Sequence, residues 1–307
     1  MIVSIIIRTL DEERHLQALL EGIASQDMGD VGVETVVVDS GSADRTLEIA
    51  AEYGCEIEHI ERDTFSFGGS LNRGCERSRG DIVVFVSGHC VPCDDQWLAE
   101  LIRPICEDKA AYVYGRQLAG PDTRFSEGEL FSRQYPEVSA VPQDGIFCNN
   151  ANAALRRDVW EKFSFATECS GLEDMELAKR IRGAGYEIGY QAGACVFHHH
   201  SERWQEVRWR FEREALALQE IMPEVHISLL DFARYVTSAI AHDMARALGQ
   251  GKLVAAFSEI VCFRWQQYLG SYRGNHMLRV LSRQNKDHYF YPRRIALRGS
   301  DEGAKDE

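Results

Sequence analysis

The chain has 307 residues, of which 45% are hydrophobic, and this is enough for one large or two modest globular domains with a buried core. Its formal net charge of −14 argues against general nucleic-acid binding, which needs a basic surface. It contains no uninterrupted apolar run of about 18 residues or more, so no transmembrane helix is expected.

The charge is unevenly distributed along the sequence. Residues 1–202 contain 18 Lys and Arg against 35 Asp and Glu, whereas residues 203–298 contain 15 against 9. The basic C-terminal third could face a surface of anionic lipid. It could equally be the solvated face of helices, so the two interpretations stay open.

The first residues, MIVSIIIRTLDEE, predict a buried strand rather than a secretory signal, because acidic residues directly follow the apolar run. The nine cysteines are scattered and odd in number, so free thiols in a reducing compartment are expected. We therefore expect a cytoplasmic protein, with the inner face of the membrane as an alternative location.

Residues 1–118 alternate between strand and helix patterns. Strands are predicted at VSIII, VETVVVD, CEIEHI, DIVVFVS and AAYVYGRQ. Helices are predicted between them at HLQALLEGIA, RTLEIAAEYG and DQWLAELIRPIC. Strands that alternate with helices of this length predict βαβ units, and hence an α/β fold with a doubly wound sheet.

This alternation stops in residues 119–202. Residues 119–148 are rich in Gly, Pro and Ser and predict a long loop that faces a substrate. Helices are predicted to begin at Arg157 and at Glu173, and two short strands are predicted at YEIGYQ and ACVFHHH.

Residues 203–298 predict two or three amphipathic helices appended to the α/β body, and residues 299–307 predict a disordered tail. Aromatic residues alternate with arginines in these helices; they are Trp204, Trp209, Phe211, Trp265 and Tyr268. This mixture suits a membrane interface, so peripheral membrane contact is one interpretation. Packing against the body is the other, and opposite faces could serve both.

Polar segments follow three of the predicted strands, at the end of a sheet where ligands of open α/β folds bind. They are RTLDEE, DSGSADRT and SGHC. Asp39 ends the second strand and could accept hydrogen bonds from a base or ribose, or simply belong to a turn before a helix N-cap. No phosphate-binding G-x-x-x-x-G-K-[ST] segment and no G-x-G-x-x-G after the first strand occur, which removes the main support for an ATPase or a dinucleotide-binding protein.

Two further segments attract attention. In FSFGGSLNRG, Gly68 and Gly69 permit close approach of backbone to a ligand, and Asn72 is expected on the first turn of the next helix. In SGHCVPC, Cys90 and Cys93 could join histidines in a zinc site, form a redox pair, or serve as small apolar filler. A deaminase is not indicated, because no H-x-E precedes the cysteines.

Taken together, these segments resemble the family 2 glycosyltransferases with the GT-A fold, particularly the rhamnosyltransferase-like branch. The matching segments are SIIIRTLDEERHL, VVVDSGSADRT, GGSLNRG, SGHCVP, CNNANAALRRDVWEKFSF, GLEDMELAKRIRGAGYEIGY and VFHHH, in the family's order over roughly residues 2–200. The resemblance implies a GT-A domain over residues 1–202, with a nucleotide-sugar-binding half at 1–118 and an acceptor and catalytic half at 119–202. It also implies an inverting transfer and a divalent metal, Mn²⁺ or Mg²⁺.

The resemblance also assigns roles to individual residues. Asp174 is expected to be the general base, and Glu173 to contact the acceptor or orient the loop, although helix starts favour carboxylates in any case. Asn149, Asn150 and Asn152 have side chains that can bond a donor or acceptor sugar; Asn150 and Asn152 are expected to bind the acceptor, and one or two of the three could instead be turn and cap residues. The residues expected to bind the nucleotide sugar are Arg8, Thr9, Asp11, Glu12, Asp39, Ser40, Gly68, Gly69, Asn72, Ser87 and Gly88.

The expected metal site departs from the family pattern. Family members generally carry Asp-x-Asp where this chain has Ser87-Gly88-His89. The metal ligands expected here are His89 and His198, and strand alternation would place His198 and His200 on one face and His199 on the other. Three adjacent histidines could also be a plain surface edge. The loss of two carboxylates puts the metal requirement in question, because imidazole suits softer metals better than Mg²⁺.

A second departure concerns phosphate. The family usually has Arg immediately before the Asn of the Gly-rich helix, where this chain has Leu71. A phosphate contact is therefore expected from Arg73 or Arg8.

The sequence thus predicts an inverting glycosyltransferase acting on a glycan or a lipid-linked acceptor. The alternative is a degenerate GT-A protein that binds nucleotide sugar or glycan as a scaffold subunit. A nucleotidyltransferase is disfavoured, because RTLDEE is acidic where a basic Gly-rich loop would be needed.

Overall fold

The computed structural model describes residues 1–276. The predicted tail at 299–307, and the part of the predicted helical region after residue 276, lie outside the described residues. Contacts divide the chain into two units, Met1–Ser201 and Glu202–Glu307, and each is described by itself.

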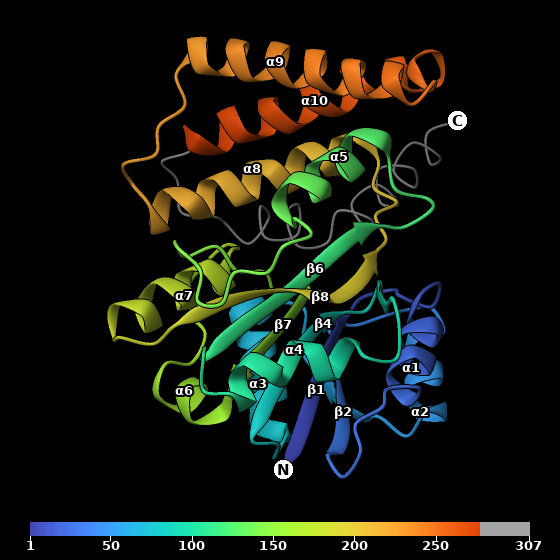
Figure 1. Cartoon of the computed structure of the whole chain (residues 1–307), viewed down its shortest axis with the longest axis vertical. Coiled ribbons are helices and arrows are strands. Elements are labelled where there is room, and N and C mark those ends of the chain that lie inside the picture. The colour runs from blue at the N-terminus through green and yellow to red at the C-terminus, as the bar shows by residue number, and fades with distance from the viewer. Residues whose placement is uncertain (277–307) are drawn as a thin grey trace, which may run out of the picture. The chain divides into compact units, whose positions relative to one another are not determined.

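The first unit is built on an eight-stranded sheet with the order β3-β2-β1-β4-β7-β6-β8-β5 (Figure 1). The strands are β1 (Ile2–Thr9), β2 (Gly32–Asp39), β3 (Glu56–His59), β4 (Ile82–Ser87), β5 (Cys90–Pro92), β6 (Tyr112–Ala119), β7 (Asn152–Arg156) and β8 (Ile188–His198). Strands β1 to β4 pair in parallel, β7 runs antiparallel between β4 and β6, and β6 pairs in parallel with β8. The predicted α/β class with a doubly wound sheet is confirmed.

The helices of this unit cover both faces of the sheet. They are α1 (Leu16–Ala24), α2 (Thr46–Glu52), α3 (Phe67–Arg77), α4 (Trp97–Cys106), α5 (Phe125–Gln134), α6 (Arg157–Lys162) and α7 (Glu173–Gly183). Successive side chains of β1 enter different cores: Ile5 packs in the cluster that contains Trp97 of α4, and Ile6 in the cluster that contains Leu71 of α3. A strand buried on both faces reads as a continuous apolar run, which explains why VSIII predicted it.

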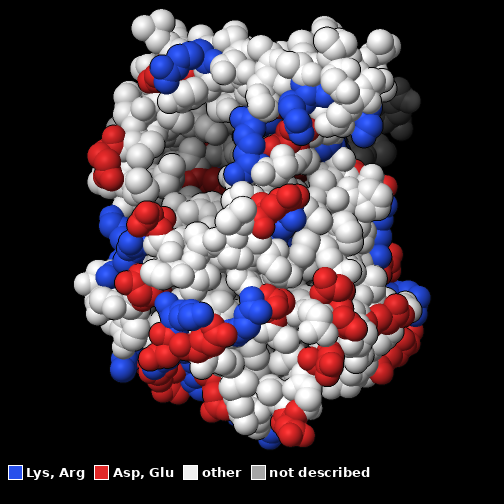
Figure 2. Space-filling model, viewed as in Figure 1, with Lys and Arg blue, Asp and Glu red and all other residues white. Residues whose placement is uncertain are grey.

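The strand register brings the predicted polar segments to one end of the sheet. Thr9 at the end of β1 pairs with Asp39 at the end of β2, and Arg8 pairs with Ser87 at the end of β4. On the face drawn in Figure 2, acidic side chains gather over this unit, in keeping with its excess of Asp and Glu.

Several predicted boundaries are wrong. The predicted loop at 119–148 contains helix α5, whose buried face includes Ser126, Glu127 and Glu129 beside Phe131. Buried polar residues of this kind hide the apolar periodicity that identifies a helix. Strands β5 and β7 were not predicted, because each is short and borders Cys, Pro or Asn residues.

The two short strands predicted near the end of this unit form one strand, β8. Its pairing with β6 is interrupted once, where Gly115 is opposite Gln191 and Arg116 is opposite Cys195. The three residues Ala192 to Ala194 therefore bulge from the ladder. Their small side chains interrupt the apolar strand pattern, which is why two separate strands were predicted.

The second unit consists, in its described part, of α8 (Trp204–Ile221), α9 (Leu229–Gly249) and α10 (Leu253–Asn275). Arg264 and Asp243 form an ion pair between α10 and α9, with 2.6 Å from Nε to Oδ2, and both side chains are almost fully buried. A Cβ on Gly274 would lie 2.0 Å from the backbone oxygen of Glu212, so α10 approaches the backbone of α8 closely.

The aromatic residues of the second unit divide between interior and surface. Phe211 packs against Phe263, whereas Trp265 is about half exposed and contacts Phe232. Among residues 1–276, no helix has the length and apolar character needed to cross a membrane.

Candidate active site

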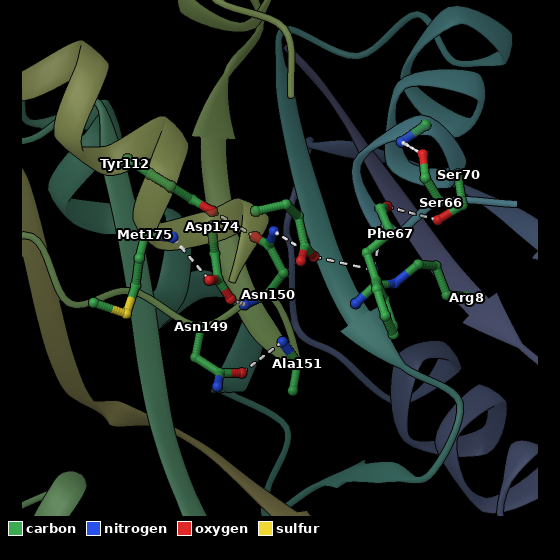
Figure 3. A network of polar contacts seen from close by, with 12 residues as sticks. Arg8, Ser66, Phe67, Ser70, Tyr112, Asn149, Asn150, Ala151, Asp174 and Met175 are labelled. Carbon is green, nitrogen blue, oxygen red and sulfur yellow. Dashed lines mark hydrogen bonds and ion pairs between the residues drawn. The ribbon is translucent and has the colours of Figure 1, made fainter. Parts of the chain in front are cut away.

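Two acidic side chains occupy the start of α7. Glu173 and Asp174 are both buried at the first turn, after Leu172 in a left-handed conformation with φ of 53°. Asp174 accepts a hydrogen bond at Oδ1 from the backbone N–H of Met175, at 2.8 Å, and at Oδ2 from the backbone N–H of Asn150, at 3.0 Å (Figure 3). A non-Gly residue at positive φ is unusual and is often found at functional sites.

The pKa of Asp174 is raised to about 8. Burial is the largest cause, because it disfavours the charged carboxylate, and repulsion by Glu173 adds to it. The backbone N–H groups of Asn150 and Met175 and the charge of Arg8 act in the opposite direction. A carboxyl group with this pKa is largely protonated at neutral pH and becomes able to accept a proton as the pH rises through about 8.

Arg8 connects the acidic pair to the end of β1. Its Nη1 lies 3.0 Å from Oε1 of Glu173 and 3.3 Å from the backbone oxygen of Phe67 at the start of α3. Its guanidinium lies over the ring of Phe67, 5.1 Å from the centroid. Arg73, the other candidate for a phosphate contact, instead pairs with Glu58 at an exposed position. Arg8 is therefore the arginine that the structure places beside the acidic pair.

Asp39 is buried, and its carboxylate organises the loop that follows β2. It accepts hydrogen bonds from the backbone N–H groups of Gly41 and Ser42, at 2.8 and 2.9 Å, and from the hydroxyl of Thr9, at 3.1 Å. Ser40 donates through its hydroxyl to the backbone oxygen of Thr9, at 3.2 Å.

The loops after β1 and β2 are joined to one another. Oδ1 of Asp11 accepts from the backbone N–H of Ala43, at 2.7 Å, and the N–H of Glu12 donates to the hydroxyl of Thr46, at 2.8 Å. The nucleotide-binding segments predicted at 8–12 and 39–40 therefore form one ordered surface. Their contact with a nucleotide stays a prediction.

Gly68 and Gly69 were expected to let backbone approach a ligand, but in the structure Gly68 lies against the chain's own backbone. A Cβ on Gly68 would lie 2.2 Å from the backbone oxygen of Ala166, so the close approach made here is to the chain itself. Gly69 donates its N–H to the N-cap hydroxyl of Ser66, at 3.1 Å. Both glycines lie inside α3, which begins at Phe67.

Asn72 lies on the second turn of α3, so its predicted place on the first turn is wrong. Its Nδ2 donates to the backbone oxygen of Phe165, at 2.8 Å, and its Oδ1 accepts from the backbone N–H of Phe165 and from Nε1 of Trp160, both at 3.0 Å. This side chain therefore anchors the segment that leads to α7.

The two asparagines predicted to bind the acceptor are both buried. Asn152 donates through Nδ2 to the backbone oxygens of Arg116 and Ala194 and accepts at Oδ1 from Nε1 of Trp97. These bonds join β7 to its neighbours and leave Asn152 fully buried, so the geometry does not support the predicted acceptor contact.

Asn150 instead contacts both residues of the acidic pair, Glu173 and Asp174. Besides its backbone bond to Asp174, its Nδ2 lies 3.5 Å from Oε1 of Glu173, and its Oδ1 accepts from the hydroxyl of Tyr112, at 2.5 Å. We interpret Asn150 as a residue that positions the two carboxylates.

Three histidines form a second cluster. His89 follows β4, and its Nε2 lies 3.1 Å from Nε2 of His198 at the end of β8. The ring of His200 packs edge-on against that of His198, with centroids 4.1 Å apart. His199 points elsewhere and stacks on His15, as strand alternation predicts. Sequence reasoning selected His89 and His198 and omitted His200, although the same alternation identified its face.

Ser87 and Gly88, which were predicted to bind nucleotide sugar, precede His89 and shape its surroundings. The N–H of Ser87 bonds the backbone oxygen of Ala151, at 3.3 Å. Gly88 has no side chain, which lets Glu12 come close, since a Cβ there would lie 2.9 Å from Cγ of Glu12. Glu12, predicted to bind nucleotide, has its Oε1 2.7 Å from Nδ1 of His89.

The cysteines do not join the histidines. The Sγ atom of Cys93, directly after β5, lies 2.8 Å from Sγ of Cys195 in β8, and Cys90 is fully buried. Within residues 1–276, the group of possible metal ligands that contains His89 consists of His89, His198 and His200, without a thiol. The zinc site with Cys90 and Cys93, considered from the sequence, is therefore not the arrangement found.

A short polar link connects the histidines to the acidic pair. Nε2 of Gln117 donates to Oδ1 of Asn149, at 3.1 Å, and Oε1 of Gln117 lies 2.6 Å from Nδ1 of His198. Asn149 precedes Asn150, whose N–H bonds Asp174 (Figure 3). Gln117 was not predicted, because nothing in its local sequence marks it.

Comparison with known sequences identifies the family of the chain. Residues 4–163, just over half of the chain, match the family described as Glycosyl transferase family 2. The O-antigen chain rhamnosyltransferase RfbN of Salmonella typhimurium is 29% identical over 178 residues, which cover 54% of this chain and 57% of RfbN. The O-antigen chain rhamnosyltransferase WbaN of Salmonella anatum is 31% identical over 179 residues, which cover 55% of this chain and 57% of WbaN. The chain thus spans little more than half the length of these relatives.

Solved structures confirm the GT-A fold. The mannosyltransferase PcManGT from Pyrobaculum calidifontis, in complex with GDP-Man and Mn²⁺, has a TM-score of 0.61 at 18% identity, covering 87% of this chain and 84% of its own. Residues 1–349 of S. aureus TarS, in complex with UDP-GlcNAc, have a TM-score of 0.52 at 16% identity, covering 91% and 93%. At these identities the likeness concerns the fold, whereas the match over residues 4–163 shows that the chain belongs to glycosyl transferase family 2.

Proposed function

We propose that this protein is an inverting glycosyltransferase that moves a sugar from a nucleotide-diphosphate sugar to a hydroxyl of a glycan or lipid-linked acceptor. The observation that carries the proposal is the buried pair Glu173–Asp174, held by Arg8 and Asn150. Arg8 near the end of β1 lies at the same end of the sheet as Asp39 of β2 and Ser87 of β4.

In this proposal Asp174 is the general base. It accepts the proton of the acceptor hydroxyl while the hydroxyl oxygen forms its bond to the anomeric carbon. The bond from that carbon to the diphosphate oxygen breaks on the opposite face, and the diphosphate leaves with the electron pair, so the configuration inverts. Glu173 fixes Arg8 and raises the pKa of Asp174, which makes it the better base.

The donor side is assigned to the loops after β1, β2 and β4. The backbone and side chains of Arg8 to Glu12, Asp39 and Ser40, with Ser87 and Gly88, would line the nucleotide sugar. Complexes of PcManGT with GDP-Man and of TarS with UDP-GlcNAc support a nucleotide-sugar donor. The names of RfbN and WbaN make rhamnose the first sugar to test.

A divalent metal fits beside this surface. His89 and His198 would hold it, and such a cation neutralises charge on the departing diphosphate. The hydrogen bonds to Glu12 and Gln117 orient both rings.

The proposal is tested with a panel of UDP-, GDP- and dTDP-sugars, with CMP-sugars as the monophosphate comparison, by thermal shift and by release of the nucleotide in the presence of membrane glycolipid extracts. Stabilisation by one nucleotide and release of that nucleotide would support transfer. Tight binding without release would favour the degenerate scaffold protein instead. If no nucleotide stabilises the protein, the transferase proposal fails, and a degenerate protein that binds glycan would be favoured.

The rate of transfer is expected to increase with pH. Because only the carboxylate form of Asp174 accepts a proton, kcat/KM should rise through the pKa of about 8 and level off above it. Initial rates from pH 6 to pH 9.5, at low donor concentration, would show this rise of kcat/KM and its plateau. A rate that does not change over this range would contradict the assignment of Asp174 as the base.

A further inference from the structure

Three imidazole rings from two segments of the first unit lie close together: His89 lies between β4 and β5, His198 ends β8, and His200 follows shortly after it. A nitrogen of each of His89, His198 and His200 lies within 4.8 Å of the other two. The ring of Phe131 stacks on His198 with centroids 5.4 Å apart, which walls one side of the cluster with apolar surface. His198 is itself buried, and the other two rings are half-buried.

The hydrogen-bond network fixes the tautomer of His198. The backbone N–H of Ala151 donates to Oδ1 of Asn149, at 2.9 Å, so this amide oxygen cannot be exchanged with its nitrogen. The same oxygen accepts from Nε2 of Gln117, which leaves Oε1 of Gln117 facing Nδ1 of His198. A carboxamide oxygen only accepts, so Nδ1 of His198 carries the proton and Nε2 carries a lone pair in the neutral ring.

Carboxylates impose the same tautomer on the other two rings. Oε1 of Glu12 lies 2.7 Å from Nδ1 of His89, and Oε1 of Glu127 lies 2.6 Å from Nδ1 of His200. A carboxylate oxygen that faces Nδ1 in this way favours the tautomer with the proton on Nδ1, which leaves Nε2 of each ring as the nitrogen able to coordinate. Metal-bound histidines characteristically donate their other N–H in this way.

Lone pairs that face each other require a positive charge between them. The Nε2 atoms of His89 and His198 are only 3.1 Å apart, and they repel unless a proton or a metal ion lies between them. A proton joins only two of the rings, whereas a metal ion joins all three. Nitrogens bound tetrahedrally at about 2.0–2.1 Å are about 3.4 Å apart, close to the 3.1 Å between Nε2 of His89 and Nε2 of His198.

We propose that His89, His198 and His200 form a three-histidine metal centre that binds Zn²⁺ and Co²⁺ more tightly than Mn²⁺, and Mg²⁺ least of all. The ligand set consists of neutral nitrogens where the family pattern has carboxylates. Imidazole suits zinc and cobalt, whereas Mg²⁺ prefers oxygen ligands and retains its waters. The role of this centre beside a diphosphate rests on the proposed function, but the metal binding does not.

The test follows metal binding without any sugar donor. Full-length protein is stripped with a chelator, exchanged into metal-free buffer and titrated with Co²⁺, whose visible d–d absorption reports the coordination. Zn²⁺ is expected to displace Co²⁺ and bleach the spectrum, and Mg²⁺ in equal amount to leave it unchanged. His200→Ala is expected to weaken Co²⁺ binding by about tenfold or more.

His199→Ala is the matched control. It removes a neighbouring imidazole of the same segment that stacks on His15 and lies outside the group of three. Its Co²⁺ spectrum and affinity should equal those of the unaltered protein. Gln117→Leu provides a second variant if His200→Ala does not fold. It should weaken binding about tenfold by releasing Nδ1 of His198.

Some outcomes would overturn the proposal. Unchanged Co²⁺ binding in His200→Ala would exclude the third ligand, and displacement of Co²⁺ by equimolar Mg²⁺ would exclude the selectivity. If neither Co²⁺ nor Zn²⁺ binds, the charge between the rings is a proton. Metal binding in a protein that transfers no sugar would refute the proposed function alone.

Discussion

Asp174→Asn is expected to lower kcat by about 10²–10⁴-fold and to leave nucleotide binding intact. The amide has nearly the shape of the carboxyl group but cannot take the proton of the acceptor hydroxyl. Initial rates at saturating donor, together with the thermal shift caused by the preferred nucleotide, separate chemistry from binding. A variant that retains more than a tenth of the rate would show that another group is the base.

Glu176→Gln is the control for this variant. Glu176 lies on the same first turn of α7 and loses one charge in the same way, but it pairs with Arg180 at a partly exposed position, 2.7 Å from Oε1 to Nε. A helix pair of this spacing contributes about 0.3–0.5 kcal/mol to stability, so the rate should hardly change. If both variants lost activity equally, the effect would arise from the helix terminus and not from proton transfer.

Arg8→Ala is expected to lower the free energy of unfolding by about 3 kcal/mol, the lower end for removing one partner of a buried ion pair. Glu173 is 5% exposed and Arg8 19%, so the change leaves a buried carboxylate without its guanidinium. Because Arg8 lowers the pKa of Asp174, the rise of kcat/KM should also move to higher pH. Urea denaturation and the pH profile measure the two effects.

Two further variants show why Arg8→Ala lowers the free energy of unfolding. Arg8→Ala combined with Glu173→Gln should regain most of the stability, because the unpaired charge is removed as well. Arg73→Ala removes an exposed arginine that pairs with Glu58, and it should cost at most about 1 kcal/mol. An equal loss in the single and double variants would mean that Arg8 acts through packing on Phe67 and not through its charge.

Much of the first unit could be predicted from the sequence, because its signals are local. β1 and β4 are short apolar runs, and α1 and α4 repeat apolar residues at helical spacing. The failures have a common physical cause, which is polar or small residues in buried elements. Helix α5 buries Glu127 and Glu129, and β8 contains the bulge at Ala192 to Ala194. Such residues suggest loops when the sequence is considered alone.

The site was predictable only in part. Glu173, Asp174, His89 and His198 came from the family resemblance. The pairing of Arg8 with Glu173 spans 165 positions in the sequence, and the contact of Glu12 with His89 spans 77, so neither leaves a local pattern.

Asparagines were the least predictable residues of the site. Asn72 and Asn152 occur in segments that match the family, yet the side-chain amide of each donates to a backbone oxygen of the chain itself. In a sequence, an Asn that ties strands or loops together cannot be told from one that binds a sugar.

The burial of Asp174 also couples folding to proton uptake. Its pKa is about 8 in the folded chain and 3.8 for an ordinary Asp, so between these values the folded state holds a proton that the unfolded state releases. This group therefore makes the fold less stable as pH rises from about 4 to 8, and the loss is complete above that window. The free energy of unfolding of Asp174→Asn, relative to the unaltered protein, should accordingly increase across it, and a constant difference would contradict the coupling. A base kept ready for catalysis is thus maintained at the expense of stability in alkaline conditions.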